Sequence, residues 1–102
     1  MNEVQIKGVA DGYLTVALSG DIDSGNAEEF YLAVMDGYET TPANLLFDCD
    51  GLDFIDSTTL GTFVKILKAI KTDGYKMKLV NMQAKIKKLF VICSLDTIME
   101  IA

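Results

Sequence analysis

The chain alternates between two hydrophobic patterns along its length. Short runs rich in apolar and β-branched residues have the composition of strands, and they lie at residues 4–9, 13–18, 44–49 and 76–80, with a shorter one at 97–101. Between them, apolar residues recur at helical spacing, which predicts helices at about 24–37, 57–72 and 83–93. The predicted order of elements is β-β-α-β-α-β-α-β.

This order predicts an α/β fold. Strands that alternate with helices need crossover connections, so the inner sheet should be mainly parallel. Asp11-Gly12, a strong turn signal, adds an antiparallel hairpin at one edge. Three helices are few for two layers, so they should lie mainly on one face of this mixed sheet. The chain has 102 residues, half of them hydrophobic, which predicts one domain over residues 1–102.

Local signals indicate how the helices begin and which faces they bury. Ser24 is predicted to cap the first helix, whose inward residues are Ala27, Phe30, Tyr31 and Val34. The second helix should bury the stripe Leu60, Phe63, Val64, Leu67 and Ile70. The third should bury Ile86, Leu89, Phe90 and Cys93. Cys49 and Cys93 are therefore expected to be reduced core thiols, with no zinc site.

Charge limits the classes of partner. The formal charge of −6 argues against broad nucleic-acid binding. Residues 1–64 carry twelve acids and one Lys, whereas residues 65–102 carry eight Lys and three acids. This asymmetry fits either two solvated faces or a polarised surface that steers a partner. No apolar run approaches membrane-spanning length and no signal-peptide pattern is present, which predicts a cytosolic protein without membrane insertion.

The residues needed for common catalytic sites are missing. The chain has no His, so a nucleophilic Ser would lack its usual base. It also has no glycine-rich phosphate loop. We therefore expect neither an enzyme nor a bound cofactor. Six aspartates near strand ends suit either a divalent cation or a solvated acidic rim, and the rim, without metal, is the prediction: Asp21, Asp23, Asp48, Asp50, Asp53 and Asp56.

Residues 54–63 carry the most specific signal. Asp56 and Ser57 follow a strand-like segment and start an amphipathic helix. A helix N-terminus has free backbone N–H groups and the positive end of the helix dipole. A hydroxyl there can be a simple cap, or it can accept a phosphate, because this position tolerates a new anion. Sequence position alone leaves both alternatives open.

This block resembles the phosphoacceptor motif of STAS domains, the family of bacterial anti-sigma factor antagonists. Seven residues fit the motif: Phe54, Ile55, Asp56, Ser57, Thr58, Leu60 and Gly61. Thr59 stands where the family usually has Gly, and its side chain is expected near the acceptor, where a kinase or partner approaches. Three further segments resemble the family in order and spacing, at residues 18–23, 48–53 and 88–95.

The resemblance implies a partner-switching phosphoprotein. The unphosphorylated domain, expected to be a monomer, would bind an anti-sigma factor that is also a serine kinase, and would thereby release a sigma factor. Phosphorylation of Ser57 would reverse this, and a PP2C-type phosphatase would restore it. The partner-binding residues are expected to be Asp23, Asp56, Thr58, Thr59, Leu60, Thr62 and Ile66.

Other interpretations remain open for some of these residues. Asp23 and Asp56 also suit turn formers beside helix starts, and Ile66 also suits a position at the edge of the core. For the whole chain, the alternative is a stand-alone STAS adaptor that binds the ATPase of an ABC transporter. Such an adaptor would not need phosphorylation of Ser57.

Overall fold

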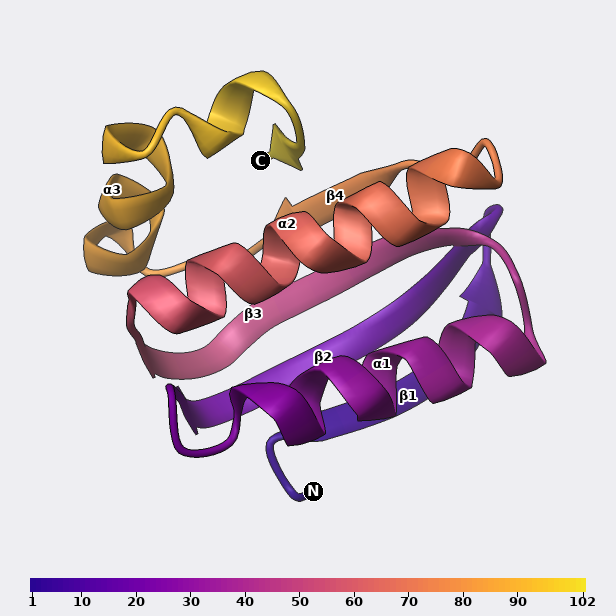
Figure 1. Cartoon of the computed structure of the whole chain (residues 1–102), viewed down its shortest axis with the longest axis horizontal. Helices are drawn as coiled ribbons and strands as arrows, with labels where there is room; N and C mark the ends of the chain where they lie inside the picture. Colours follow the sequence, from indigo (N-terminus) through magenta and orange to yellow (C-terminus); the bar gives the residue numbers. More distant parts are fainter.

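The computed structural model describes residues 1–102 (Figure 1). Its strands are β1 (Val4–Ala10), β2 (Tyr13–Ile22), β3 (Asn44–Ile55), β4 (Met77–Val80) and β5 (Glu100–Ile101). Its helices are α1 (Ala27–Thr40), α2 (Ser57–Thr72) and α3 (Ala84–Ile92), followed by a short 3₁₀ helix, η1 (Leu95–Thr97). The predicted order of strands and α-helices is confirmed.

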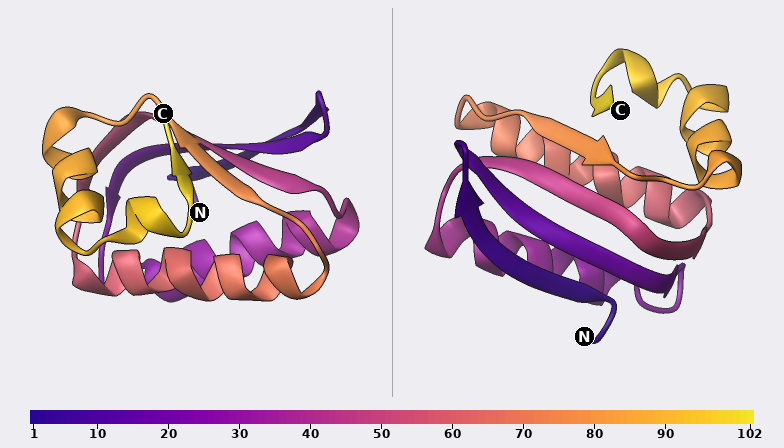
Figure 2. Two further views of the ribbon diagram at one scale, coloured as in Figure 1. Left: turned by 90° about the horizontal axis from the view of Figure 1, so that it is seen from above. Right: turned by 180° about the vertical axis from the view of Figure 1, so that it is seen from behind.

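The five strands form one sheet in sequence order, β1-β2-β3-β4-β5. β1 and β2 are antiparallel, and every other neighbouring pair is parallel. In the view from above, α1 and α2 lie together on one side of the sheet, and the opposite side carries no helix (Figure 2). The predicted α/β architecture with helices mainly on one face is therefore confirmed. None of the helices is long and apolar enough to cross a membrane.

The edge hairpin forms where its turn signal predicted it. Ala10 pairs with Tyr13, so the loop between β1 and β2 consists of Asp11 and Gly12 alone. Both loop residues have positive φ, 54° and 83°. This is the backbone of the two-residue turn that matches the twist of paired strands, and Asp-Gly is a preferred sequence for it.

The core lies between the sheet and the helices. Four phenylalanine rings from α1, β3, α2 and α3 meet edge to face with centroids 5.1 to 6.2 Å apart, and all four are fully buried: Phe30, Phe47, Phe63 and Phe90. One aromatic ring from each of four elements thus fixes the positions of α1, α2 and α3 against the centre of the sheet.

Several element boundaries differ from the sequence-based expectation. β3 continues to Ile55 rather than ending at Cys49, because register shifts against β2 accommodate extra β3 residues between positions 48 and 54. The last strand is only Glu100–Ile101, because residues 95–97 form η1.

The two cysteines have different environments. Cys49 is fully buried, and burial raises the pKa of its thiol to about 12. It is the inert core thiol that was predicted. Cys93 is exposed, because it caps α3 at its C-terminus, beyond the buried Ile86 and Phe90. Leu89 is also 36% exposed, so the predicted inward positions of Cys93 and Leu89 are wrong.

Candidate functional site

The site forms where β2 and β3 end side by side. Ile22 and Ile55, the last residues of these parallel strands, are register partners. The loop before α1 and the start of α2 therefore emerge at the same edge of the sheet. This arrangement brings the loop around Asp23 to the start of α2, where Ser24 is hydrogen-bonded to Asp56, 32 residues further along the chain.

Asp56 links the two loops and caps α2. One of its carboxylate oxygens accepts a hydrogen bond from the N–H of Thr59 at 3.0 Å, and the other accepts one from the N–H of Ser24 at 2.8 Å. Asp56 is therefore the N-cap, and Ser57 is the first residue of the helix. The Thr59 N–H and then the Ser24 N–H hold the pKa of the Asp56 carboxyl below its ordinary value. The charged cap therefore contributes fully to folding stability when the pH is above the ordinary pKa of an Asp carboxyl. This contribution is lost as the pH falls through the lowered pKa of Asp56.

The side chains of Asn26 and Asp23, rather than that of Ser24, hold the loop before α1. Asn26, not Ser24, occupies the N-cap position of α1. Its side-chain oxygen accepts a hydrogen bond from the Asp23 N–H at 2.8 Å, and its amide donates to the Asp21 carbonyl at 3.0 Å. The predicted Ser24 cap is wrong because α1 begins at Ala27, so Ser24 lies in the loop two residues before the N-cap. There its backbone N–H donates to Asp56. The Asp23 carboxylate accepts from the Gly25 N–H at 2.8 Å, as a turn former does.

Thr59 is part of the scaffold, since its side chain is fully buried. Its hydroxyl donates a hydrogen bond to the carbonyl of Ile22 at the end of β2. The same hydroxyl accepts from the N–H of Asp56 at 3.5 Å, which completes a capping box. The expectation that Thr59 faces a kinase or partner is therefore wrong. The buried Thr59 side chain therefore links the start of α2 to the end of β2.

Ser57 has a different environment. Its side chain is exposed, and no hydrogen bond of this corner involves its hydroxyl. The hydroxyl stands on the first residue of a 16-residue helix. Because Asp56 already provides the cap, the Ser57 hydroxyl is free for another interaction. Of the two alternatives left open by the sequence, the structure excludes the simple cap for Ser57.

Of the remaining residues predicted to bind a partner, some are accessible to solvent and others are buried in the core. Thr58 is exposed, and Thr62 is half-buried with its hydroxyl donating to the Thr58 carbonyl at 2.9 Å. Leu60 is 8% exposed and Ile66 is fully buried. The expectation that Leu60 and Ile66 contact a partner is therefore wrong, since both side chains belong to the core. The accessible members of the predicted partner-binding set are Asp23, Asp56, Thr58 and Thr62, which lie around the exposed Ser57.

One residue of the motif, the apolar Phe54, is exposed beside the site, and the sequence did not predict this exposure. Phe54 is 50% exposed, and with Leu89 of α3 it lines a shallow groove of about 160 Å³. Its ring is left outside the core because the neighbouring residues Leu52 and Ile55 are the buried ones at the end of β3. The irregular burial there follows from the register shifts of β3, which no simple alternation pattern indicates.

The six aspartates near the strand ends do not form a metal site. No group of three or more Asp, Glu or Cys side chains is placed to hold a metal ion. Two of these aspartates instead bind neighbouring side chains: Asp48 accepts from the Asn81 amide and Asp53 from the Gln83 amide, each at 3.1 Å.

The hydroxyl of Thr59 should contribute measurably to stability. Thr59→Val keeps the shape but removes the donor to the Ile22 carbonyl, so it should lower the free energy of unfolding by about 1–3 kcal/mol. Urea denaturation would measure this. Thr62→Val is the matched control, because it removes a hydroxyl from the partly exposed side of the same helix and should change stability by no more than about 0.5 kcal/mol. Equal effects of the two substitutions would contradict the structural role of Thr59.

Comparison with known proteins places this geometry in a family. The STAS domain model matches residues 3–102. A candidate anti-sigma factor antagonist from Thermotoga maritima matches at 28% identity over 96% of this chain and 82% of its own, with a TM-score of 0.78. The Bacillus cell fate determinant SpoIIAA in its phosphorylated form matches at 18% identity over 97% of this chain and 90% of its own, with a TM-score of 0.73. A murine anion transporter of the Solute Carrier 26 family matches at 20% identity over 84% of this chain but only 14% of its own, with a TM-score of 0.72.

Proposed function

The chain belongs to the STAS domain family, and we propose that it is a cytoplasmic anti-sigma factor antagonist switched by phosphorylation of Ser57. The unphosphorylated domain binds an anti-sigma factor that is also a serine kinase, and sigma factor is released. Transfer of phosphate to Ser57 ends this binding, and a PP2C-type phosphatase restores it. In this cycle the domain is a substrate and a binding module, not an enzyme.

The observation that carries the proposal is the exposed, unpaired hydroxyl of Ser57 on the first residue of α2. A phosphate adds about −1.5 to −2 charges and three acceptor oxygens. The helix N-terminus stabilises an anion locally, and the cap formed by Asp56 does not depend on the Ser57 hydroxyl. Phosphorylation therefore leaves the scaffold intact. It does place a second negative group beside Asp56. This group repels an acidic partner surface, and it would lose its hydration against an apolar one.

A comparison within the family supports a switch without refolding. The anti-sigma factor antagonist SpoIIAA matches this chain in its unphosphorylated form with a TM-score of 0.75 and in its phosphorylated form with 0.73. The two forms of that protein are thus about equally similar to the present fold. A phosphate on Ser57 would then act through its charge at the surface of the domain rather than through a change of fold.

The docking surface of the proposal is the accessible side of the first turns of α2, with the loop around Asp23. Thr62→Lys places a long charged side chain on that surface and should disrupt partner binding, with a change in stability within about 0.5 kcal/mol. Calorimetry would measure binding and circular dichroism the thermal midpoint, on the same samples.

Thr72→Lys is the matched control for this experiment. Thr72 lies at the other end of α2, is exposed, and donates its hydroxyl to the carbonyl four residues earlier at 3.0 Å, as Thr62 does at 2.9 Å. The control should bind normally. Normal binding by Thr62→Lys would place the interface elsewhere, and equal loss in both variants would remove the evidence for a local contact.

The second candidate function is an adaptor for a transporter. The match to one segment of a murine anion transporter favours it, since this fold also occurs as a part of transporters. An adaptor would bind an ABC transporter ATPase irrespective of phosphorylation. Recovery of bound proteins from native cells before and after phosphatase treatment separates the two functions, because only the switch gains a kinase-type anti-sigma factor after dephosphorylation.

A further inference from the structure

A second concave site lies at the far end of α2 from Ser57. A cavity of about 310 Å³ opens between the last turns of α2, the start of β4 and the C-terminal segment around η1 and β5. Ser57 is the first residue of α2 and Lys71 is near its end, so the two sites are about 20 Å apart along the helix. The proposed phosphoryl switch uses none of the residues of this cavity.

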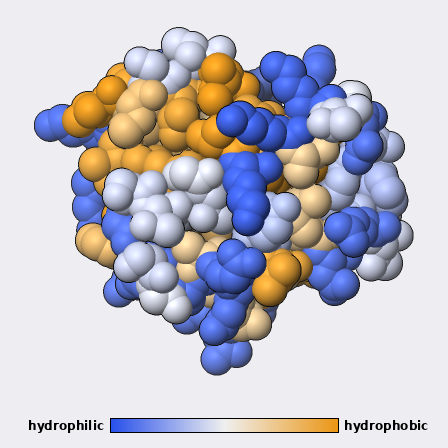
Figure 3. All heavy atoms as spheres, viewed as in Figure 1, coloured by the Kyte–Doolittle hydropathy of each residue, from blue (hydrophilic) through white to orange (hydrophobic).

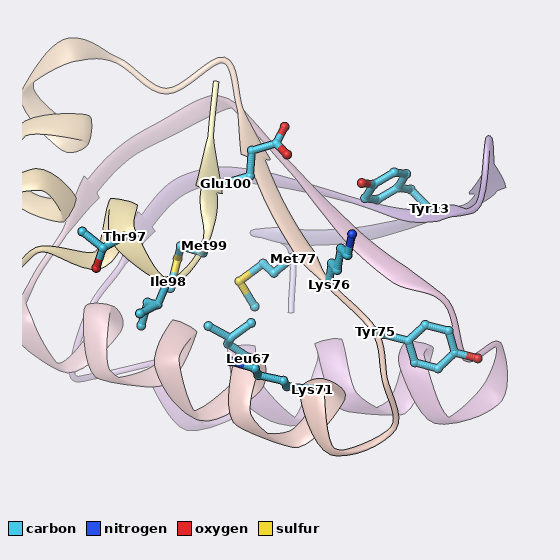
Figure 4. A pocket seen from close by; sticks show the side chains of 10 residues that line it. All are labelled: Tyr13, Leu67, Lys71, Tyr75, Lys76, Met77, Thr97, Ile98, Met99 and Glu100. Atoms are coloured by element: carbon cyan, nitrogen blue, oxygen red, sulfur yellow. The ribbon is translucent and has the colours of Figure 1, made fainter.

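The floor of the cavity is apolar and adaptable. Leu67, Met77 and Met99 are 7%, 3% and 5% exposed, and Ile98 forms a more open wall. The close-up shows these side chains pointing toward one another between α2 and the sheet edge (Figure 4). Over the same region, between α2 and the C-terminal segment, the surface is predominantly apolar (Figure 3). Unbranched methionine side chains can fit ligands of varied shape.

Two lysines lie on different sides of this apolar floor, Lys71 on α2 and Lys76 just before β4 (Figure 4). Lys71 and Lys76 line the cavity, together with Tyr13 and Tyr75. The one ion pair of the structure joins Lys78 and Glu100 at 3.0 Å, so neither cavity lysine is neutralised by a carboxylate.

The charge around the cavity also favours an anion. The only acid that lines it is Glu100, and its carboxylate is paired with Lys78. Apart from Tyr13, all of its residues come from residues 65–102, the segment that carries eight Lys and three acids. A negatively charged group is thus attracted to a cavity whose floor remains apolar.

We propose that this cavity binds a small amphiphilic anion, an aliphatic carboxylate of medium chain length. The chain occupies the floor formed by Leu67, Met77 and Met99, and the carboxylate lies at the rim of the cavity, where the positive charges of Lys71 and Lys76 attract it. The volume falls at the lower end of the range for ligand pockets, which fits one short chain rather than a lipid with two. This assignment is independent of the switch at Ser57.

Titration of the full chain with decanoate, followed through its backbone amide NMR signals, tests the proposal. Decanoate should bind with Kd below about 1 mM and shift the amides of the cavity residues. Decylamine has the same chain with a positive charge, and acetate has the charge without the chain, so both should bind at least tenfold more weakly. Lys71→Gln combined with Lys76→Gln should weaken decanoate binding by about three- to tenfold.

Lys68→Gln provides the control. Lys68 is an exposed lysine one turn before Lys71 and does not line the cavity, so its substitution should leave decanoate affinity unchanged. Equal binding of decylamine, shifts that map away from the cavity, no binding below 1 mM, or an equal loss in Lys68→Gln would each overturn the assignment. None of these outcomes depends on phosphorylation of Ser57.

Discussion

Ser57→Ala should abolish phosphate transfer from the cognate anti-sigma kinase, whereas the wild-type chain should gain one phosphate on Ser57. The exposed hydroxyl at the first position of α2 is the only group removed by this substitution. Since Asp56 rather than Ser57 caps the helix, the free energy of unfolding should change by no more than about 0.5 kcal/mol. Intact-mass spectrometry would measure the phosphate, and urea denaturation the stability.

Thr58→Ala controls for the choice of acceptor. Thr58 is the neighbouring exposed hydroxyl residue in the same helical turn, and its substitution should leave labelling complete. Phosphate found on Thr58, or wild-type chain left unlabelled by a kinase that is active on another substrate, would contradict the assignment of Ser57.

Ser57→Asp should weaken binding to the anti-sigma partner by about 1–3 kcal/mol, or roughly five- to 150-fold in Kd. The new carboxylate stands beside Asp56 on the proposed docking surface, while the helix N-terminus stabilises it within the domain. The thermal midpoint should therefore hardly change. Because Asp carries less charge than phosphate, the phosphorylated wild type should bind more weakly still.

Ser57→Asn separates charge from shape in this experiment. Asn is nearly isosteric with Asp but neutral, so it should keep most of the affinity in the same calorimetric titration. If Asn and Asp weaken binding equally, the loss comes from the altered side chain and not from its charge, and the electrostatic explanation of the switch fails.

Features set by short stretches of sequence could be predicted well. The turn at Asp11-Gly12 depends on two residues that both accept positive φ. The bounds of α2, residues 57–72, were predicted because Asp56 precedes a regular apolar pattern and Asp73-Gly74 follows it. The parallel sheet followed from the alternation of strands and helices.

The orientation of α2 was harder to predict. The predicted stripe is confirmed for Leu60, Phe63, Leu67 and Ile70, which are all buried. The prediction missed two further buried residues, Thr59 and Ile66, and it placed Val64 too deep. In the structure Thr59, Phe63, Ile66 and Ile70 are all fully buried, whereas Val64 is only partly buried. α2 packs against both β3 and α1, so its buried face also takes in Ile66. A buried threonine needs a hydrogen-bond acceptor for its hydroxyl, so a sequence pattern places threonine outside the core. Here the acceptor is the carbonyl of Ile22, which is distant in the sequence.

The geometry of the site depends on contacts that no local pattern indicates. The bond between the Ser24 N–H and the Asp56 carboxylate spans 32 residues. It exists because β2 and β3 end side by side. The sequence could therefore identify Asp56 and Ser57 as important, but not that Asp56 joins two loops while the Ser57 hydroxyl stays free.

Release of sigma factor from its anti-sigma kinase is the most direct test of the proposed function. Fluorescence anisotropy of labelled sigma factor would follow its complex with the kinase as this chain is added, in unphosphorylated and then stoichiometrically phosphorylated form. The unphosphorylated chain should displace sigma factor, and the phosphorylated chain should leave the complex intact. Failure of the unphosphorylated chain to displace sigma factor, or equal displacement by both forms, would contradict a switch centred on Ser57.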